Sequence, residues 1–346
     1  MEHGVVDVFQ DIVGKTIAVD VYDKRGVLLF KEGTIIDGHV YNKLMRMGVY
    51  YVSVYFSKSS VVKETSSLEN FRENYKQDVS AYKGILTSLA AGKDLEYLQV
   101  DQLSHSILSK VNSNYLVAEC LNQMRSKDEY TYNHSVNVSL YSMLIAKWLK
   151  LSQKQIRDVI QAGVLHDIGK AQVPDSILNK KGPLLPAEFE EMKKHSTIGY
   201  NLAKRIKGLN YDIAKAVLMH HEREDGHGYP LKVKGTRISL YAKILAVADV
   251  YDALTSERCY KHRITPFDTF IELESIGYGH FDPKTLLTFL SNISSYYIGS
   301  KVKMNTGDIG QVAYISPHAI SKPVVKIGDL LIDLFKNKEY AIVEML

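Results

Sequence analysis

Seven histidine and aspartate side chains in the middle of the chain have the chemistry needed to hold divalent metal ions. The pair His166-Asp167 ends an apolar stretch, and both side chains are costly to bury unless a partner satisfies them. The other candidates are His134, His195, His220, His221 and Asp249. Seven nitrogen and oxygen ligands are too many for one zinc ion but suit two metal ions that share a carboxylate. The sequence therefore predicts the binuclear centre of a metallohydrolase.

The candidate ligands divide into two sites that share Asp167 as a bridge. The first site would contain His134, His166, Asp167 and Asp249, and the second would contain His195, His220 and His221. Imidazole together with carboxylate suits Fe, Mn, Zn, Ni or Co and argues against Mg or Ca. Two such ions about 3.5–4 Å apart activate a bridging water towards a phosphorus atom. Hydrolysis of a phosphate ester is therefore the expected reaction.

Helices must position most of these residues, because the chain from about 128 to 295 carries an almost continuous helical pattern. Loops are expected at Gly182-Pro183 and from Gly226 to Pro230. Residues 57–67 are polar and rich in serine, and they are predicted to be a linker or a domain boundary. The residues that follow, up to 124, have the apolar spacing of helices that lead into the metal-binding part.

The two ends of the chain have strand patterns instead. In the first 56 residues we expect strands at 16–22 and 27–30, a helix at 37–47 and an edge strand at 49–56. After residue 297 we expect short strands at 301–304, 311–315, 324–327 and 340–343. These patterns predict a small N-terminal α/β module and a small C-terminal β appendage.

The composition excludes several classes of protein. The net charge is +4 over 346 residues with no block of Lys or Arg, so a DNA- or RNA-binding surface is not expected. Only two cysteines occur, Cys120 and Cys259, which argues against a disulfide framework. No signal peptide and no apolar run long enough for a membrane span is recognised. The expected location is the cytoplasm.

Four ordered segments carry a resemblance to a known family. His166-Asp167 with Gly169-Lys170 is similar to the HDxGK motif of the HD phosphohydrolase superfamily. The segment 220–230 resembles the HHE…DGxGYP signature of the HD-GYP branch. Similar segments also run from Asp128 to His134 and from Asp249 through Thr255 towards Arg258 and Tyr260. The match covers roughly residues 125–295.

This resemblance implies a mainly α protein with an all-helical HD-type metallohydrolase domain. The expected parts are an N-terminal α/β module at 1–56, a linker and helices at 57–124, the HD-GYP domain at 125–296 and the β appendage at 297–346. Members of the branch are bacterial phosphodiesterases that cleave cyclic di-GMP to pGpG and often onward to GMP. The resemblance thus implies hydrolysis of cyclic di-GMP by a metal-bridged hydroxide, with two divalent transition metals, Fe or Mn in preference to Zn or Ni.

The family's functional positions fall on residues of this chain. Its metal ligands fall on the seven residues named above, and Asp167 and Lys170 would take part in catalysis. Its substrate contacts fall on Lys170, Tyr229, Arg258 and Lys261. Some members bind a third metal through a glutamate that Tyr130 replaces here, so two ions are expected. Asp252 follows Asp249 by one turn and is interpreted as a carboxylate on the helix surface, with the alternative that it orients a ligand histidine.

Two other functions remain open on the sequence. The same site could hydrolyse another cyclic dinucleotide such as 3′,3′-cyclic GMP-AMP, because one fold hosts several phosphohydrolases. A protein that binds cyclic di-GMP without cleaving it is the alternative from a different class, although a pure sensor has no need of a complete ligand set. Besides cyclic di-GMP, a homodimer and a diguanylate cyclase or another signalling protein are the partners considered.

Overall fold

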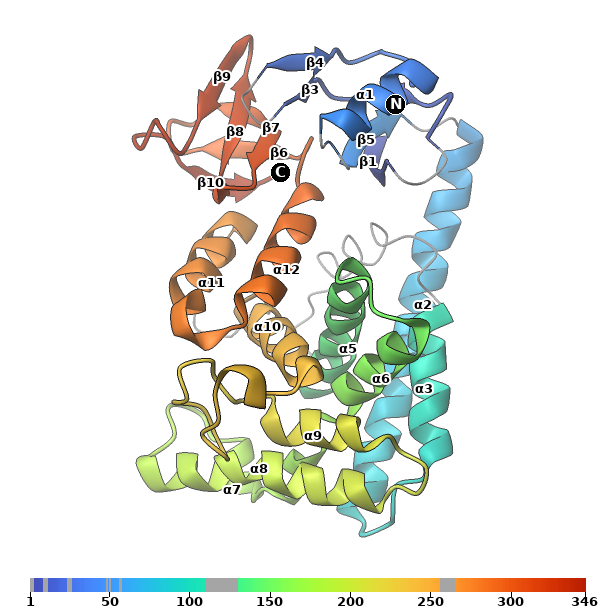
Figure 1. Cartoon of the computed structure of the whole chain (residues 1–346), viewed down its shortest axis with the longest axis vertical. Helices are drawn as coiled ribbons and strands as arrows, with labels where there is room; N and C mark the ends of the chain where they lie inside the picture. The colour runs from blue at the N-terminus through green and yellow to red at the C-terminus, as the bar shows by residue number, and fades with distance from the viewer. Residues whose placement is uncertain are drawn as a thin grey trace. The chain divides into compact units, whose positions relative to one another are not determined.

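The computed structural model describes residues 3–8, 12–23, 27–47, 49, 51–55, 58–109, 130–255 and 265–346 (Figure 1). The chain forms two compact units. One contains residues 1–69, 262–272 and 290–346, and the other contains residues 70–261 and 273–289. The first and last parts of the sequence therefore belong to the same unit.

The N-terminal part of the first unit is built on a three-stranded antiparallel sheet in the order β1-β5-β2. Its elements are β1 (His3–Asp7), β2 (Thr16–Ile17), the paired strands β3 (Val21–Tyr22) and β4 (Leu28–Phe30), helix α1 (Gly38–Arg46) and β5 (Tyr51–Tyr55). Helix α1 begins where the Asp37 carboxylate accepts the backbone N–H groups of His39 and Val40.

Two predictions for this part were wrong in detail. The expected edge strand at 49–56 is the central strand β5, because β1, which the sequence pattern did not reveal, pairs with its other side. The single strand expected at 16–22 is two strands with different partners, since β2 pairs with β5 and β3 pairs with β4. A local alternation of apolar residues does not show which strand will lie beside it.

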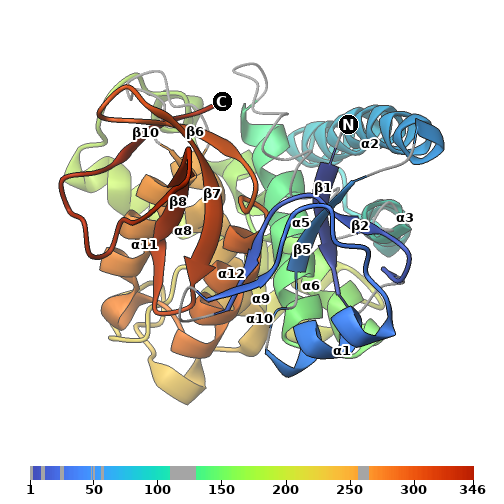
Figure 2. The same ribbon diagram turned by 90° about the horizontal axis from the view of Figure 1, so that it is seen from above.

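The C-terminal part of the same unit is a five-stranded antiparallel sheet in the order β10-β6-β7-β8-β9. Figure 2 shows its strands β6, β7, β8 and β10 from above. Its strands are β6 (Lys301–Met304), β7 (Ile309–Ser316), β8 (Ala319–Ile327), β9 (Leu330–Asp333) and β10 (Ile342–Met345). Four of them were expected from the sequence, and β9 was not. Lys326 of β8 forms an ion pair with Asp20 of the N-terminal part, at 2.9 Å between Nζ and Oδ2.

The second unit is helical. Its elements include most of α2 (Lys58–Ala90), α3 (Tyr97–Ser109), α5 (Tyr130–Trp148), α6 (Gln153–Leu165), the 3₁₀ turn η1 (Ile168–Gln172), α7 (Asp175–Leu178), α8 (Pro186–Arg205), α9 (Tyr211–Met219), η2 (Gly235–Arg237) and α10 (Leu240–Thr255). Helices α11 (Pro266–His280) and α12 (Pro283–Ser295) each have residues in both units. None of the helices among the described residues is long and apolar enough to cross a membrane.

The segment at 57–67 is helical from Lys58 on, because it belongs to helix α2. It contains neither glycine nor proline, so nothing in its backbone interrupts a helix that the following residues favour. The division between the two compact units falls just after it, between residues 69 and 70.

Local sequence signals fix where helix α6 starts and stops. Ser152 and Gln155 form a capping box at its first turn. Gly163 lets α6 approach α5 closely, since a Cβ atom there would lie 2.7 Å from the Cα atom of Ser139. The helix ends at Leu165, with His166 as its C-cap residue, so the His166-Asp167 pair stands at a helix end packed against its neighbour.

Candidate metal centre

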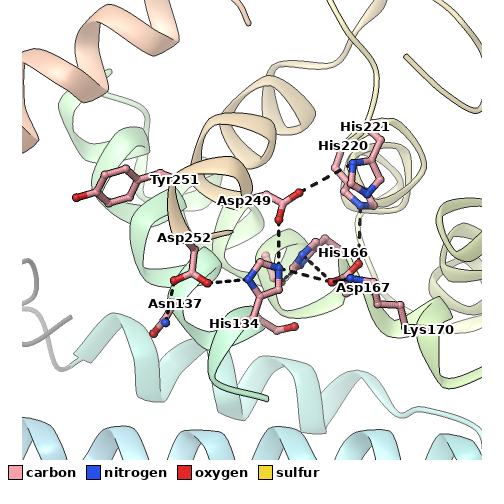
Figure 3. Close-up of polar contacts among 12 residues, drawn as sticks. His134, Asn137, His166, Asp167, Lys170, His220, His221, Asp249, Tyr251 and Asp252 are labelled. Carbon is pink, nitrogen blue, oxygen red and sulfur yellow. Dashed lines mark hydrogen bonds and ion pairs between the residues drawn. The ribbon is translucent and has the colours of Figure 1, made fainter. Parts of the chain in front are cut away.

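The ends and faces of five helices bring the seven predicted ligands together. Figure 3 labels all of them except His195. His134 comes from α5, His166 and Asp167 follow α6, His195 comes from α8, His220 and His221 follow α9, and Asp249 comes from α10. Asp167, His195, His220 and His221 form one group of mutually close ligand atoms, and His134, His166 and Asp167 form another, each within 4.8 Å. Asp249 lies between the groups, with Oδ1 3.1 Å from His134 Nε2 and Oδ2 4.0 Å from His221 Nδ1.

Three histidines are oriented by the same kind of hydrogen bond, from the ring to a backbone carbonyl oxygen. The Nδ1–H groups of His166, His195 and His220 donate to the carbonyl oxygens of Gly163, Met192 and Val217, each at 2.7 Å. Because a carbonyl only accepts, each Nδ1 must carry the proton, and the neutral ring presents a lone pair at Nε2. This is the usual arrangement by which proteins fix the tautomer of a metal-binding histidine.

His134 is oriented by a carboxylate instead. Its Nδ1 lies 2.7 Å from Asp252 Oδ2, and the other oxygen of Asp252 accepts the Asn137 amide at 2.9 Å (Figure 3). Asp252 is only 2 % exposed, so its interpretation as a helix-surface carboxylate was wrong. Its spacing of three residues from Asp249, within an otherwise apolar helix, was the signal that favoured the alternative.

Several buried polar atoms in this cluster are left without ordinary partners. His166 Nε2 and Asp167 Oδ1 have no hydrogen-bond partner among the described residues. His195 Nε2 and His220 Nε2 lie 3.3 Å apart, and both present lone pairs when Nδ1 carries the proton. Such contacts are unfavourable in a buried site unless a cation lies among these atoms. The donor set therefore fits divalent metal ions, which bind imidazole nitrogen and carboxylate oxygen together.

The protonation states agree with this fit. Burial would raise the pKa of Asp167, but Lys170 and His166 hold it well below its usual range. Burial lowers the pKa of His220, and it lowers that of His221 to about 3, so both rings are neutral near pH 7. Metal binding requires these deprotonated forms.

His134 behaves differently. Burial acts to lower its pKa, but hydrogen bonds to Asp249 and Asp252 raise it well above the usual value. A proton on its Nε2 occupies the position that a metal ion beside Asp249 would take, so metal binding there should release it.

Close backbone packing keeps His195 beside Asp167. A Cβ atom on Gly169 of η1 would lie 2.0 Å from the carbonyl oxygen of His195 and 2.6 Å from the amide nitrogen of Gly199. Only glycine allows η1 to approach α8 this closely. The glycine of the Gly169-Lys170 pair thus sets the distance between two of the candidate ligands.

The loop after His221 is closed by a buried carboxylate. Glu222 is 3 % exposed and accepts the backbone N–H groups of Leu231, Lys232 and Val233, at 2.6 to 3.1 Å. The loop folds back so that the Tyr229 ring stacks on His221, with 4.6 Å between the ring centroids.

Comparison with known proteins agrees with this arrangement of motifs. Residues 119–285 match the family model of the HD domain. Segment 119–285 is an HD domain of the HD-GYP branch. Within it, the described helices α5 to α10 supply all seven candidate ligands.

Several curated proteins are similar to this chain in sequence. The chain is 36% identical over 228 residues to a cyclic di-GMP phosphodiesterase of Pseudomonas aeruginosa, covering 66% of this chain and 54% of that one. It is 39% identical over 176 residues to a cyclic di-GMP phosphodiesterase of Thermotoga maritima, covering 50% of this chain and 48% of that one. The chain thus spans about half the length of these relatives.

A further relative is named for a different substrate, and one solved structure has a similar fold. A 3′,3′-cGAMP-specific phosphodiesterase of Vibrio cholerae is 35% identical over 181 residues, covering 52% of this chain and 35% of that one. An HDGYP protein from Bdellovibrio bacteriovorus has a TM-score of 0.54 at 14% identity, covering 83% of this chain and 98% of that one. That structure supports the fold alone.

The predicted substrate contacts differ in their surroundings and in whether the structure describes them. Lys170 forms an ion pair with Asp167 Oδ2, and its side chain is 28% exposed. Tyr229 lies over His221, as described above. Arg258 and Lys261 lie outside the described residues, and the side chain of Tyr130 is not described. The roles assigned to all of these residues stay predictions.

Proposed function

We propose that this protein hydrolyses cyclic di-GMP to pGpG, GMP or both. The observation that carries the proposal is the pair of ligand groups sharing Asp167, in an HD-GYP domain whose curated relatives are named cyclic di-GMP phosphodiesterases. Two adjacent groups suit two divalent ions better than one. We propose Fe or Mn as the native metals, with Zn or Ni as alternatives that the same ligands accept.

The protein's own residues have separable tasks in this reaction. His134, His166, Asp167 and Asp249 would hold one ion, and His195, His220 and His221 would hold the second beside Asp167. Bound ions of this kind supply an ionised water near neutral pH and neutralise charge on the phosphate. Lys170 places a positive charge at Asp167, where it would attract a nonbridging phosphate oxygen. Tyr229 would line the edge of the site that faces the substrate.

Turnover of cyclic di-GMP tests the proposal. The protein is purified without oxygen, loaded with Fe(II) or Mn(II) and incubated with cyclic di-GMP, and the nucleotides are separated by chromatography. We expect pGpG or GMP from the wild type and none from Asp167→Ala, which should also hold less metal. Asp212→Asn is a matched control, because this exposed carboxylate in the first turn of α9 pairs only with Lys215 among the contacts described for it. Full activity in Asp167→Ala would refute the assigned site.

The Vibrio cholerae relative named as a 3′,3′-cGAMP-specific phosphodiesterase favours that dinucleotide as a second candidate. The two substrates are offered separately and then together in the same assay. A higher kcat/KM for 3′,3′-cyclic GMP-AMP would replace cyclic di-GMP in the proposal. Tight binding of either nucleotide without turnover in the metal-loaded protein would instead favour a sensor.

We also propose the cytoplasm as the location, because the two cysteines are far apart in sequence and suit a reducing compartment. A homodimer and a diguanylate cyclase or another signalling protein are the proposed partners. Size-exclusion chromatography with light scattering, and co-purification with a tagged form of the protein, test these two proposals.

A further inference from the structure

Helix α8 presents an aromatic ring and a cation beside the loop that carries Tyr229. Phe189 is 47% exposed, so its ring is open to a ligand. Its ring centroid lies 6.5 Å from that of Tyr229, with the two ring planes at 78°. Lys193, one turn further along α8, places Nζ 5.3 Å from the Phe189 centroid and 5.8 Å from the Tyr229 centroid. These three residues are called the α8 cluster below.

The α8 cluster is continuous with the candidate metal centre. Tyr229 stacks on His221 at 4.6 Å between centroids, and it lies 6.4 Å from His195 in an edge-on contact. His195 itself follows Lys193 by two residues on the same helix. A molecule whose phosphate lies at the metal centre can therefore extend over Tyr229 and reach Phe189 and Lys193.

The chemistry of the cluster suits a purine base. Aromatic side chains bind bases by stacking, because every base has a flat π face. An ammonium group donates hydrogen bonds to O6 and N7 of guanine, which are both acceptors. Adenine has an amino donor in place of O6, and that donor opposes a lysine. A lysine held between two aromatic rings therefore favours guanine over adenine.

One acidic side chain competes for Lys193. Glu190 Oε1 lies 2.5 Å from Lys193 Nζ, but the Glu190 side chain is 69% exposed. Exposed ion pairs of this kind contribute little to stability, so a ligand can displace the carboxylate. The lysine is thus held near the aromatic rings without being neutralised by a buried partner.

We propose that the α8 cluster is a guanine-binding subsite, in which Phe189 stacks on the base and Lys193 recognises its O6 and N7 atoms. This inference rests on the proposed function in one respect, namely that the ligand is a guanine nucleotide with its phosphate at the metal centre. It assigns to α8 a part in choosing the base, in addition to supplying His195.

A comparison of GMP with AMP tests the subsite without requiring turnover. Binding of each mononucleotide to the metal-loaded full chain is measured by calorimetry for the wild type, Phe189→Ala and Lys193→Gln. The wild type should bind GMP more tightly than AMP. Lys193→Gln should weaken GMP binding by about 5- to 100-fold and remove the preference, and Phe189→Ala should weaken both nucleotides.

The same helix offers a matched control. Lys204 Nζ lies 5.0 Å from the Tyr200 ring, and Tyr200 lies 6.5 Å from Tyr211. Lys204→Gln thus removes a cation of the same geometry that has no described contact with the candidate ligands, and it should leave both affinities unchanged. Metal content and thermal unfolding are measured for every variant. If Phe189→Ala does not fold, Lys193→Gln still decides the test, because the Lys193 side chain is partly exposed and its replacement should not disturb the fold.

Two results would overturn the subsite: equal binding of GMP and AMP by the wild type, or a GMP preference that survives in Lys193→Gln. A second assay separates this inference from the proposed function. It compares kcat/KM for cyclic di-GMP with that for cyclic di-AMP, a diester that carries adenine in place of guanine. Lys193→Gln should lower the first value relative to the second. A wild type that prefers GMP but does not cleave cyclic di-GMP would support the subsite while refuting the proposed function.

Discussion

Replacing Asp252 by Asn should weaken metal binding through His134 without removing a ligand. The two oxygens of Asp252 accept from His134 Nδ1 at 2.7 Å and from Asn137 Nδ2 at 2.9 Å. Asparagine has one acceptor oxygen, so its NH₂ group must face one of these two donors. The Asp252→Asn variant therefore loses a buried hydrogen bond, as well as the charge that favours the metal-binding orientation of His134.

The size of the effect follows from these contacts. One buried donor left unsatisfied costs about 1–3 kcal/mol of stability. Loss of a carboxylate that orients a ligand histidine lowers metal affinity by about 10- to 100-fold. The first effect belongs to any buried hydrogen bond, whereas the second belongs only to residues that act on a metal ligand. Measuring both quantities distinguishes the two roles.

Asp158 provides the matched control. It is a buried carboxylate on α6 whose Oδ2 accepts from two side chains, Asn210 at 2.7 Å and Tyr241 at 3.2 Å. Neither partner is a candidate ligand. Asp158→Ala leaves both donors without this acceptor, so it should lose at least as much stability as Asp252→Asn while keeping the metal affinity of the wild type.

The assay is a titration of Mn(II) into chelator-buffered protein, with metal content measured by mass spectrometry and stability measured by denaturant unfolding of the apo-protein. We expect Asp252→Asn to need about 10- to 100-fold more free metal for half occupancy of its weaker site. If both variants lose similar stability and bind Mn(II) like the wild type, then Asp252 has only a structural role and our reasoning about His134 is wrong.

Three further predictions concern the residues packed around the candidate metal centre and the removal of its metal. Gly169→Ala should lower metal content and cost about 1–3 kcal/mol of stability, because its Cβ atom would lie 2.0 Å from the His195 carbonyl oxygen. The control Gly84→Ala, in helix α2 with open space around it, should keep both the metal content and the stability of the wild type. Glu222→Gln should raise KM more than it lowers kcat, because one of the three backbone N–H groups that bind Glu222 and fix the Tyr229 loop loses its acceptor. A fall in kcat with an unchanged KM would contradict this prediction. Chelation should lower the melting temperature, and added Mn(II) should restore it in proportion to the logarithm of its concentration; a melting temperature independent of metal would argue against a metal centre.

The sequence was most informative where chemistry and local pattern coincide. His166-Asp167 and His220-His221 could be recognised as a potential centre because buried pairs of polar residues need a partner that apolar helices do not supply. The helix ends that hold these pairs also have local signals, such as the Ser152 capping box of α6. Most strands of the C-terminal sheet followed from alternation alone, because one face of that sheet is buried.

The errors concern information that a local pattern does not contain. Strand β5 has the alternation of a half-buried strand whether it is central or at an edge, and its position depends on β1, more than 40 residues earlier. Asp252 could not be assigned to the surface or the interior without knowing that α5 places His134 and Asn137 against it. Phe189 and Lys193 carry no recognised motif, and only the fold of the loop at Tyr229 gives them a common neighbour.

The union of both chain ends in one unit bears on the order in which this protein can fold during synthesis. Strand β3 packs against β7, and Asp20 pairs with Lys326, which follows it by 306 residues. At about 5–20 residues per second, a ribosome needs on the order of 15–60 s to make the intervening chain. The helical unit can therefore form while β3 still lacks its contact with β7 and Asp20 still lacks Lys326. The surface of β3 that later packs against β7 would be open to chaperones and to other nascent chains for that time.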